Sequence, residues 1–264
     1  MKIRGLIAVL AIGALAAGCS RAAPSHGAAA PAPAPQALTG YLAPPLLLQA
    51  NRRAAGIRLS GDAVPGAAVR LASPDGSAIT GAADRRGVWS LTTPASPSPR
   101  LYSLSETVGA RLVRAIGYIA VLPAPGPAAA MLRPAAAAVL PPADPQRGIA
   151  AIDYDASGAA MASGRTAGGE TIRLFLDGKD AGEDRADASG VFSAALSQTL
   201  TPAAHLLSVA GERMHASAVF PAPRTTQVAT PPYDSARMDG AWRLDWMTPG
   251  GGVQSTVLFD ERGG

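Results

Sequence analysis

Short stretches of alternating apolar and polar residues are the dominant pattern of this chain. Val69-Arg70-Leu71 and Ile172-Arg173-Leu174 both alternate with a period of two, and an Asp-Gly pair follows each stretch. This period is typical of a strand with one face in a core and the other in water. Asp-Gly favours type I′ hairpin turns, in which both central residues have positive φ. The pattern therefore predicts antiparallel β-sheet.

The same arrangement of glycines and apolar residues occurs twice, and the offset from Val69 to Ile172 is 103 residues. The Asp-Gly pair departs from this offset by one residue. The matched pieces are Ser60-Gly61 with Ser163-Gly164, Gly66 with Gly169, Val69-Arg70-Leu71 with Ile172-Arg173-Leu174, Asp75-Gly76 with Asp177-Gly178, and Asp84, Gly87, Val88, Trp89 and Ser90 with Asp187, Gly190, Val191, Phe192 and Ser193. We expect two copies of one domain, with Trp89 and Phe192 filling the space between two sheets.

The sequence of the first copy resembles the bacterial immunoglobulin-like domains that occur in tandem in surface proteins. The residues that carry the resemblance are Pro65 to Leu71, Asp75-Gly76, and Asp84 to Ser90. The second copy is similar but lacks the proline and has Phe192 at the position of Trp89. The resemblance implies two antiparallel β-sandwiches. It leaves the ligand open, because members of the family serve as spacers, adhesin modules and accessory domains.

Near its C-terminus the chain predicts a β-hairpin. Residues 241–247 alternate, 249–252 are Pro-Gly-Gly-Gly, and 253–259 alternate again. Because an isolated hairpin is marginal in water, this one should pack on another element. Trp242 and Trp246 share one face with Leu244. They have two interpretations: a platform for a glycan or protein partner, or a stripe that closes the second sandwich or a small subdomain. Arg243 and Asp245, on the other face, are expected to form a solvated pair.

The first residues resemble the leader of a bacterial lipoprotein. Lys2 and Arg4 precede an apolar run over 6–17, which has the length of a secretory signal and is too short to span a membrane. The sequence Leu-Ala-Ala-Gly-Cys at 15–19 resembles a lipoprotein cleavage site and contains the only cysteine, Cys19. The resemblance implies acylation of Cys19, and Ser20 in place of aspartate implies the outer membrane, facing the periplasm or the surface.

An ordinary signal peptide is the alternative interpretation of this leader. The lipoprotein pattern usually has leucine at the third position before the cysteine, where this chain has Ala16. Cleavage after Ala16 would release a soluble periplasmic protein.

The expected fold class is all-β: two tandem immunoglobulin-like sandwiches and a C-terminal β-hairpin, after a disordered N-terminal tether. The expected segments are a signal peptide over 1–18, an Ala/Pro-rich tether over 19–37, a first sandwich over 38–122, an Ala/Pro-rich linker with one edge strand over 123–147, a second sandwich over 148–221, a linker over 222–239, and the hairpin over 240–260. The stretch 38–55 is expected to add a short strand to the first sandwich.

Composition and motifs favour a protein without catalytic, metal or cofactor chemistry. The acidic cluster from Asp177 to Asp187 lacks the spacing of a calcium loop and is better explained by hairpin turns. His26, His205 and His215 lack zinc-site spacing, and no nucleophile elbow or phosphate-binding loop occurs. With one cysteine, the chain forms no internal disulfide. The absence of a basic run argues against nucleic acid.

The sequence thus predicts a non-enzymatic, lipid-anchored cell-envelope protein whose sandwiches act as a spacer or a protein-interaction scaffold. Its partners would be the membrane, through the N-terminal lipid, and an envelope protein or glycan. The alternative is a carbohydrate- or peptidoglycan-binding module that uses Trp242 and Trp246.

Overall fold

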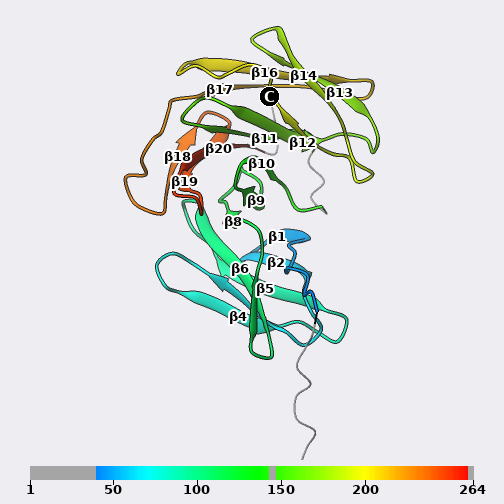
Figure 1. Ribbon diagram of the computed structural model, residues 1–264, viewed down its shortest axis with the longest axis vertical. Helices are drawn as coiled ribbons and strands as arrows, with labels where there is room; N and C mark the ends of the chain where they lie inside the picture. Colours follow the sequence, from blue (N-terminus) through cyan, green and yellow to red (C-terminus); the bar gives the residue numbers. More distant parts are fainter. Residues whose placement is uncertain (1–39, 143–146, 261–264) are drawn as a thin grey trace, which may run out of the picture. The chain divides into compact units, whose positions relative to one another are not determined.

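The computed structural model describes residues 40–142 and 147–260, and its regular structure there is entirely β-strand. In these two stretches, twenty strands form four antiparallel sheets (Figure 1). Within the described residues, no helix is long and apolar enough to cross a bilayer. The all-β class and the tandem immunoglobulin-like sandwiches are confirmed. The predicted tether over 19–37 lies outside the described residues.

The first sandwich packs a three-stranded sheet against a larger one. The small sheet has the order β1-β2-β5, and the facing strands have the order β4-β3-β6-β7. Their bounds are β1 Gln49–Arg53, β2 Gly56–Asp62, β3 Ala68–Ala72, β4 Ala78–Ala82, β5 Val88–Pro94, β6 Arg100–Val108 and β7 Arg111–Arg114. Apolar residues of both sheets form one core, in which Trp89 is 1% exposed. The aromatic residue expected between the sheets is therefore there.

The second sandwich repeats this arrangement. The order β11-β12-β15 corresponds to β1-β2-β5, and β14-β13-β16-β17 corresponds to β4-β3-β6-β7. The bounds are β11 Gly148–Asp155, β12 Ala160–Arg165, β13 Thr171–Leu176, β14 Lys179–Arg185, β15 Val191–Ala195, β16 Ala204–Gly211 and β17 His215–Pro221. Phe192 is 1% exposed in its core. Since strand order and buried aromatic residue agree in both copies, the repeat predicted from sequence is a repeat of structure.

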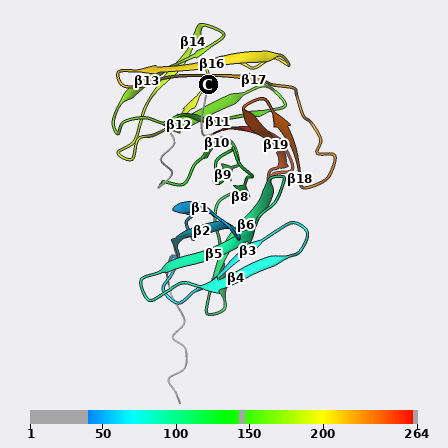
Figure 2. The ribbon, with the colours of Figure 1, turned by 180° about the vertical axis from the view of Figure 1, so that it is seen from behind.

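Six further strands extend the two sandwiches. β8 Tyr118–Val121, β9 Ala129–Arg133 and β10 Ala136–Val139 continue the large sheet of the first sandwich beyond β6. β18 Tyr233–Met238, β19 Ala241–Met247 and β20 Val253–Phe259 continue the β11 sheet of the second, because β20 pairs with β11. Figures 1 and 2 show β8, β9 and β10 between the β1–β6 strands and the sheet of β11 and β20.

These strands change two of the expected linkers. The segment 123–147 contains two paired strands, β9 and β10, where one edge strand was expected. The segment 222–239 contains β18, which pairs with β19 along its whole length. The hairpin over 240–260 is confirmed, with Ala241 opposite Phe259. It is part of the second sandwich's sheet, which is how the chain buries an element that would be unstable alone.

The one-residue slip in the repeat arises from two different turns. In the second copy, Asp177 and Gly178 have φ values of 52° and 75°, as a type I′ turn requires. In the first copy the turn is longer, and the amide of Ser73 donates to the carbonyl of Ser77 at 2.9 Å. A bulge in β14 at Ala181 then restores the offset, since Leu174 lies opposite Gly182 and Phe175 opposite Asp180.

The matched Ser-Gly pairs allow two chain segments to approach closely. A Cβ on Gly61 would lie 1.9 Å from the carbonyl oxygen of Leu46, and one on Gly164 would lie 2.1 Å from that of Gly148. In the first copy the approaching segment is hydrogen-bonded, because the amide of Leu46 donates to the carbonyl of Asp62 at 2.8 Å. The stretch 38–55 therefore adds its strand, β1, to the first sandwich as expected.

Candidate functional site

The first predicted site residue, Cys19, lies outside the described residues. Its lipidation therefore stays a prediction from the sequence.

The other two predicted site residues, Trp242 and Trp246, lie in a buried core. They are 9% and 0% exposed, and they pack with Leu244 against β8–β10 of the first sandwich. The ring of Tyr118 meets that of Trp246 edge-on, with the centroids 5.8 Å apart. A glycan platform needs an exposed ring face, whereas these rings are covered by protein. Of the two interpretations, the structure therefore has the stripe closing a core.

This core joins the two sandwiches, and we call it the junction core. Its apolar members come from β6, β8, β9 and β10 on one side and from β11, β19 and β20 on the other. They are Leu101, Ala120, Leu122, Ala130, Leu132, Ala138, Leu140, Ala150, Ala151, Trp242, Leu244, Trp246 and Leu258. The sheet of β11 is thus buried on both faces, since its opposite face covers the core of the second sandwich.

A buried polar network crosses the junction core, centred on Asp153. One carboxylate oxygen accepts the amide of Ala138 at 2.7 Å, and the other accepts the amide group of Gln254 at 2.9 Å and the hydroxyl of Thr256. The indole of Trp246 donates to Thr256 at 2.9 Å. Every donor of this network has a partner, so these groups are buried without losing their hydrogen bonds. The indole nitrogen of Trp242, also in the junction core, is buried without one.

The environment of Asp153 changes its acidity. Burial raises the pKa of this carboxyl from 3.8 to about 6, although the hydrogen bonds from Thr256, Ala138 and Gln254 act in the opposite direction. Desolvation disfavours the charged form, and the three donors recover part of that cost. The pKa of Asp153 therefore lies within the pH range commonly used for measurements in solution.

Arg243 and Asp245 form a pair, but it is not the solvated pair that the alternation predicted. Their side chains are 15% and 14% exposed, and the guanidinium contacts both carboxylate oxygens. Thr225 and Ser255 complete the hydrogen bonds, and Tyr154 lies on the same face. The prediction was wrong on exposure because side chains from outside the hairpin, Thr225 and Tyr154, lie against this pair.

The acidic cluster from Asp177 to Asp187 is divided among separate local contacts. Asp180 pairs with Arg173, Asp184 accepts the amide of Ser193 at 2.8 Å, and Asp187 accepts the amide of Ser189 at 2.8 Å. No group of three or more metal-ligating side chains converges within the described residues. These carboxylates therefore act in turns and strand pairing.

Among the described residues, His205 and Asp177 form the pair that most resembles part of a catalytic arrangement. Its Nδ1 lies 2.7 Å from the carboxylate of Asp177, and its Nε2 lies 3.0 Å from the carbonyl of Thr201. Burial acts to lower the pKa of His205, but its hydrogen bonds, above all that to Asp177, give a net rise above 6.5. Both ring nitrogens are thus engaged by neighbouring groups of the protein, Nδ1 by Asp177 and Nε2 by Thr201, so His205 closes a turn.

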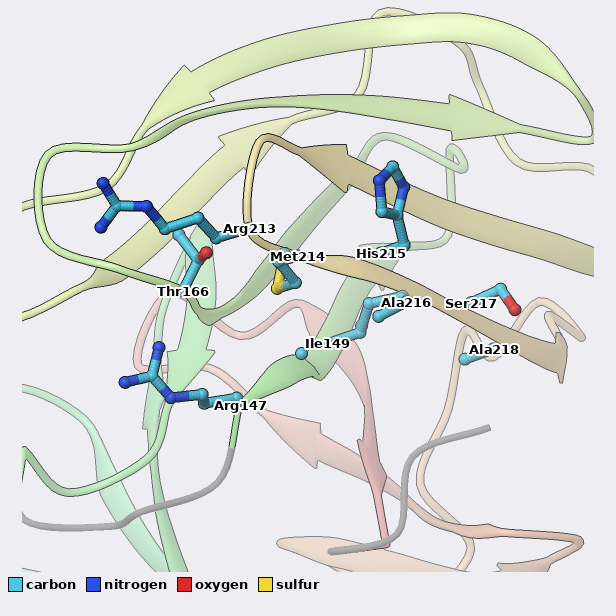
Figure 3. A pocket seen from close by; sticks show the side chains of 10 residues that line it. Arg147, Ile149, Thr166, Arg213, Met214, His215, Ala216, Ser217 and Ala218 are labelled. Carbon is cyan, nitrogen blue, oxygen red and sulfur yellow. The ribbon is translucent and has the colours of Figure 1, made fainter.

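One hollow combines charged and apolar side chains. It lies between the start of β11 and β17, has a volume of about 230 Å³, and is lined by Arg147, Thr166, Arg213, Met214 and neighbouring residues. Figure 3 shows Arg147, Thr166 and Arg213 at one end, Met214 in the middle, and His215 directed away from β11. Ile149 and Met214, 4% and 8% exposed, form its apolar floor.

Sequence reasoning found neither this hollow nor the polar network. The sequence does contain a signal for the network, because Asp153 lies inside the apolar run 149–154, where an acidic side chain needs buried partners. The sequence gives no such signal for Arg147 and Arg213, because 66 residues separate them and only the packing of the two sheets brings them together.

The strand order, rather than similarity to known proteins, defines the sandwiches. No family model and no curated protein matches the chain. Two solved structures share the all-β class at low similarity. The central fibronectin-III array of RIM-binding protein is 12% identical over 82% of this chain and 89% of that one, with a TM-score of 0.26. A Ca²⁺-stabilized adhesin that helps an Antarctic bacterium reach out and bind ice is 14% identical over 84% and 67%, with a TM-score of 0.23.

Proposed function

We propose that this chain is a non-enzymatic, lipid-anchored protein of the bacterial cell envelope, in which the two joined sandwiches act as a spacer or protein-interaction scaffold. The junction core carries the scaffold part of the proposal. Tandem domains joined by a solvated linker move independently, whereas here strands of both sandwiches share a core with a satisfied polar network. A rigid pair keeps whatever binds one sandwich at a fixed distance from the other sandwich.

The anchor part of the proposal rests on the leader and on Cys19. An acylated cysteine at the mature N-terminus would hold the protein at the outer membrane, since each buried methylene contributes about 0.8 kcal/mol. The proposal that the protein is not an enzyme rests on the described residues alone, where the one His-Asp pair, His205 with Asp177, is used internally.

The anchor is tested by intact mass and membrane fractionation of the full chain expressed in a Gram-negative host. We expect a triacylated product that begins at Cys19 and fractionates with the outer membrane. Cys19→Ala should be neither lipidated nor matured at that position. An unmodified, soluble wild-type product that begins at Ala17 would contradict the anchor and leave a periplasmic protein.

The scaffold is tested by the distance between one spin label on each sandwich, measured by pulsed electron resonance. Arg85→Cys and Lys179→Cys place labels at exposed turn and strand positions of the two sandwiches, in a chain whose native cysteine is replaced by Cys19→Ala. We expect one narrow distance distribution. A control pair within one sandwich, Arg85→Cys with Arg111→Cys, gives the width expected of a rigid body. A junction distribution much broader than this control would contradict the scaffold.

A further inference from the structure

We propose that the hollow between β11 and β17 binds the carboxylate or phosphate group of a small organic anion. This site is independent of the scaffold, because it lies in the second sandwich and shares no residue with the junction core.

The charge of the hollow is the first argument. Its lining contains two arginines, Arg147 and Arg213, and no acidic side chain. Both arginines are exposed, and neither forms an ion pair within the described residues. A guanidinium presents several donors in a planar fork that matches an oxyanion. Two unpaired guanidinium groups at one end of a concave site therefore favour an anionic ligand.

Glu170, an acidic residue that contacts the lining of the hollow, is already engaged by the protein. Its carboxylate accepts the hydroxyl of Thr166 and the backbone amide of Arg213, the latter at 2.6 Å. These hydrogen bonds hold the pKa of Glu170 below its ordinary value. They also fix the turn that presents Arg213, while the guanidinium itself stays outside an ion pair. Glu170 thus orders the end of the hollow. Its single negative charge, which interacts with the positive charge of Arg213, is outnumbered by the two arginines of the lining.

The floor of the hollow determines the rest of the ligand. Ile149, Met214, Ala216 and Ala218 provide apolar surface next to the arginines (Figure 3). Methionine adapts its shape to different apolar groups. The volume of about 230 Å³ is below the usual range for drug-sized ligands. A short aliphatic chain that ends in an oxyanion therefore fits both the charge and the size.

Calorimetric titration of the protein with three short probes tests this assignment. Butyrate carries the carboxylate, butyl phosphate carries the phosphate, and n-butylammonium has a similar chain with the opposite charge. We expect at least one anion to bind with a Kd of about a millimolar, and n-butylammonium not to bind. The anion that binds more tightly identifies the source of the oxyanion.

Variants connect the binding to the two arginines. Arg213→Gln and Arg147→Gln should each raise the Kd about tenfold, the effect of losing one charge-assisted hydrogen bond. Arg85→Gln, an exposed turn arginine of the first sandwich, should leave it unchanged. The melting temperatures should stay the same, since these side chains are exposed. Absence of binding by both anions at about ten times that concentration, or equal affinities in all four proteins, would overturn the proposal.

Discussion

At the residue scale, two titratable side chains couple the stability of this protein to pH. Asp153 is buried in the junction core with a pKa raised to about 6, and His205 is buried beside Asp177 with a raised pKa. Both raised pKa values change the stability in the same direction as the pH is varied. A group whose folded-state pKa exceeds its unfolded value takes up its proton more readily in the folded state, so acidification favours folding over that interval.

For Asp153, the interval runs from about 6 down to 3.8. The shift corresponds to about 3 kcal/mol of stability that appears as the pH falls through this window. Asp153→Asn does not titrate, so the unfolding free energy of wild type relative to this variant should rise between pH 7 and pH 4. Urea titrations across that range measure it. A difference independent of pH would show that Asp153 keeps an ordinary pKa.

For His205, the favourable contribution is complete below the unfolded pKa of 6.5 and is lost as the pH rises through the higher folded value. His205→Gln should therefore be destabilising at pH 6, and less so at pH 9. The His205 resonances in an NMR titration report the pKa directly. A pKa for His205 at or below 6.5 would contradict the ion pair with Asp177.

At the element scale, the matched glycines of β2 and β12 decide how closely adjacent segments pair. A Cβ at Gly164 would lie 2.1 Å from the carbonyl oxygen of Gly148 and 2.5 Å from the ring of Phe192. A backbone atom and a core ring must both move to accept it. The same constraint at Gly61 explains why the sequence repeats a glycine at this position of both copies.

Gly164→Ala should consequently lower the unfolding free energy by about 3 kcal/mol or more, the upper part of the range for overpacking. Gly250→Ala is the matched control, because its Cβ would meet only the hydroxyl of Thr248, at 4.0 Å, and its φ is not in the left-handed region. The control should stay within about 0.5 kcal/mol of wild type. Chemical denaturation of both variants measures the difference, and equal stability would mean that β11 and β12 separate without cost.

The sequence predicted the strands and turns better than it predicted which strands lie beside one another. The period of two, the turn residues and the repeat identified both sandwiches and the hairpin of β19 and β20, because these signals are local. The roles of Trp242 and Arg243 depended on which strands lie beside the hairpin. Pairing of β20 with β11 joins residues about a hundred positions apart, and β9 and β10 cover the tryptophans. A local pattern contains no information on such pairing.

At the scale of the whole molecule, the junction core makes the sandwiches one cooperative unit. We expect wild type to unfold in a single calorimetric transition. Trp246→Ala removes a fully buried ring and should cost about 3–5 kcal/mol. It should also separate the unfolding of the first sandwich from that of the second, because the ring contacts Tyr118 across the junction.

Trp246→Phe is the matched variant for this experiment. It keeps most of the ring and loses the hydrogen bond to Thr256, which should cost about 1 kcal/mol and leave one transition. Two transitions in wild type would show that the junction core does not couple the sandwiches. One transition in Trp246→Ala would show that the coupling does not depend on this ring.

The pairing of β20 with β11 also determines the order in which the two sandwiches can complete their sheets. Every strand of the first sandwich lies within residues 49–139, so that half has all its partners as soon as this stretch is available. The second half begins with β11 at Gly148, but one edge of β11 stays open until Val253–Phe259 arrives. A chain that emerges from its N-terminus would thus display an unpaired edge of β11 for about a hundred residues of synthesis. Such an edge is a template for mispairing, and it makes the second sandwich the half in which mispairing is expected.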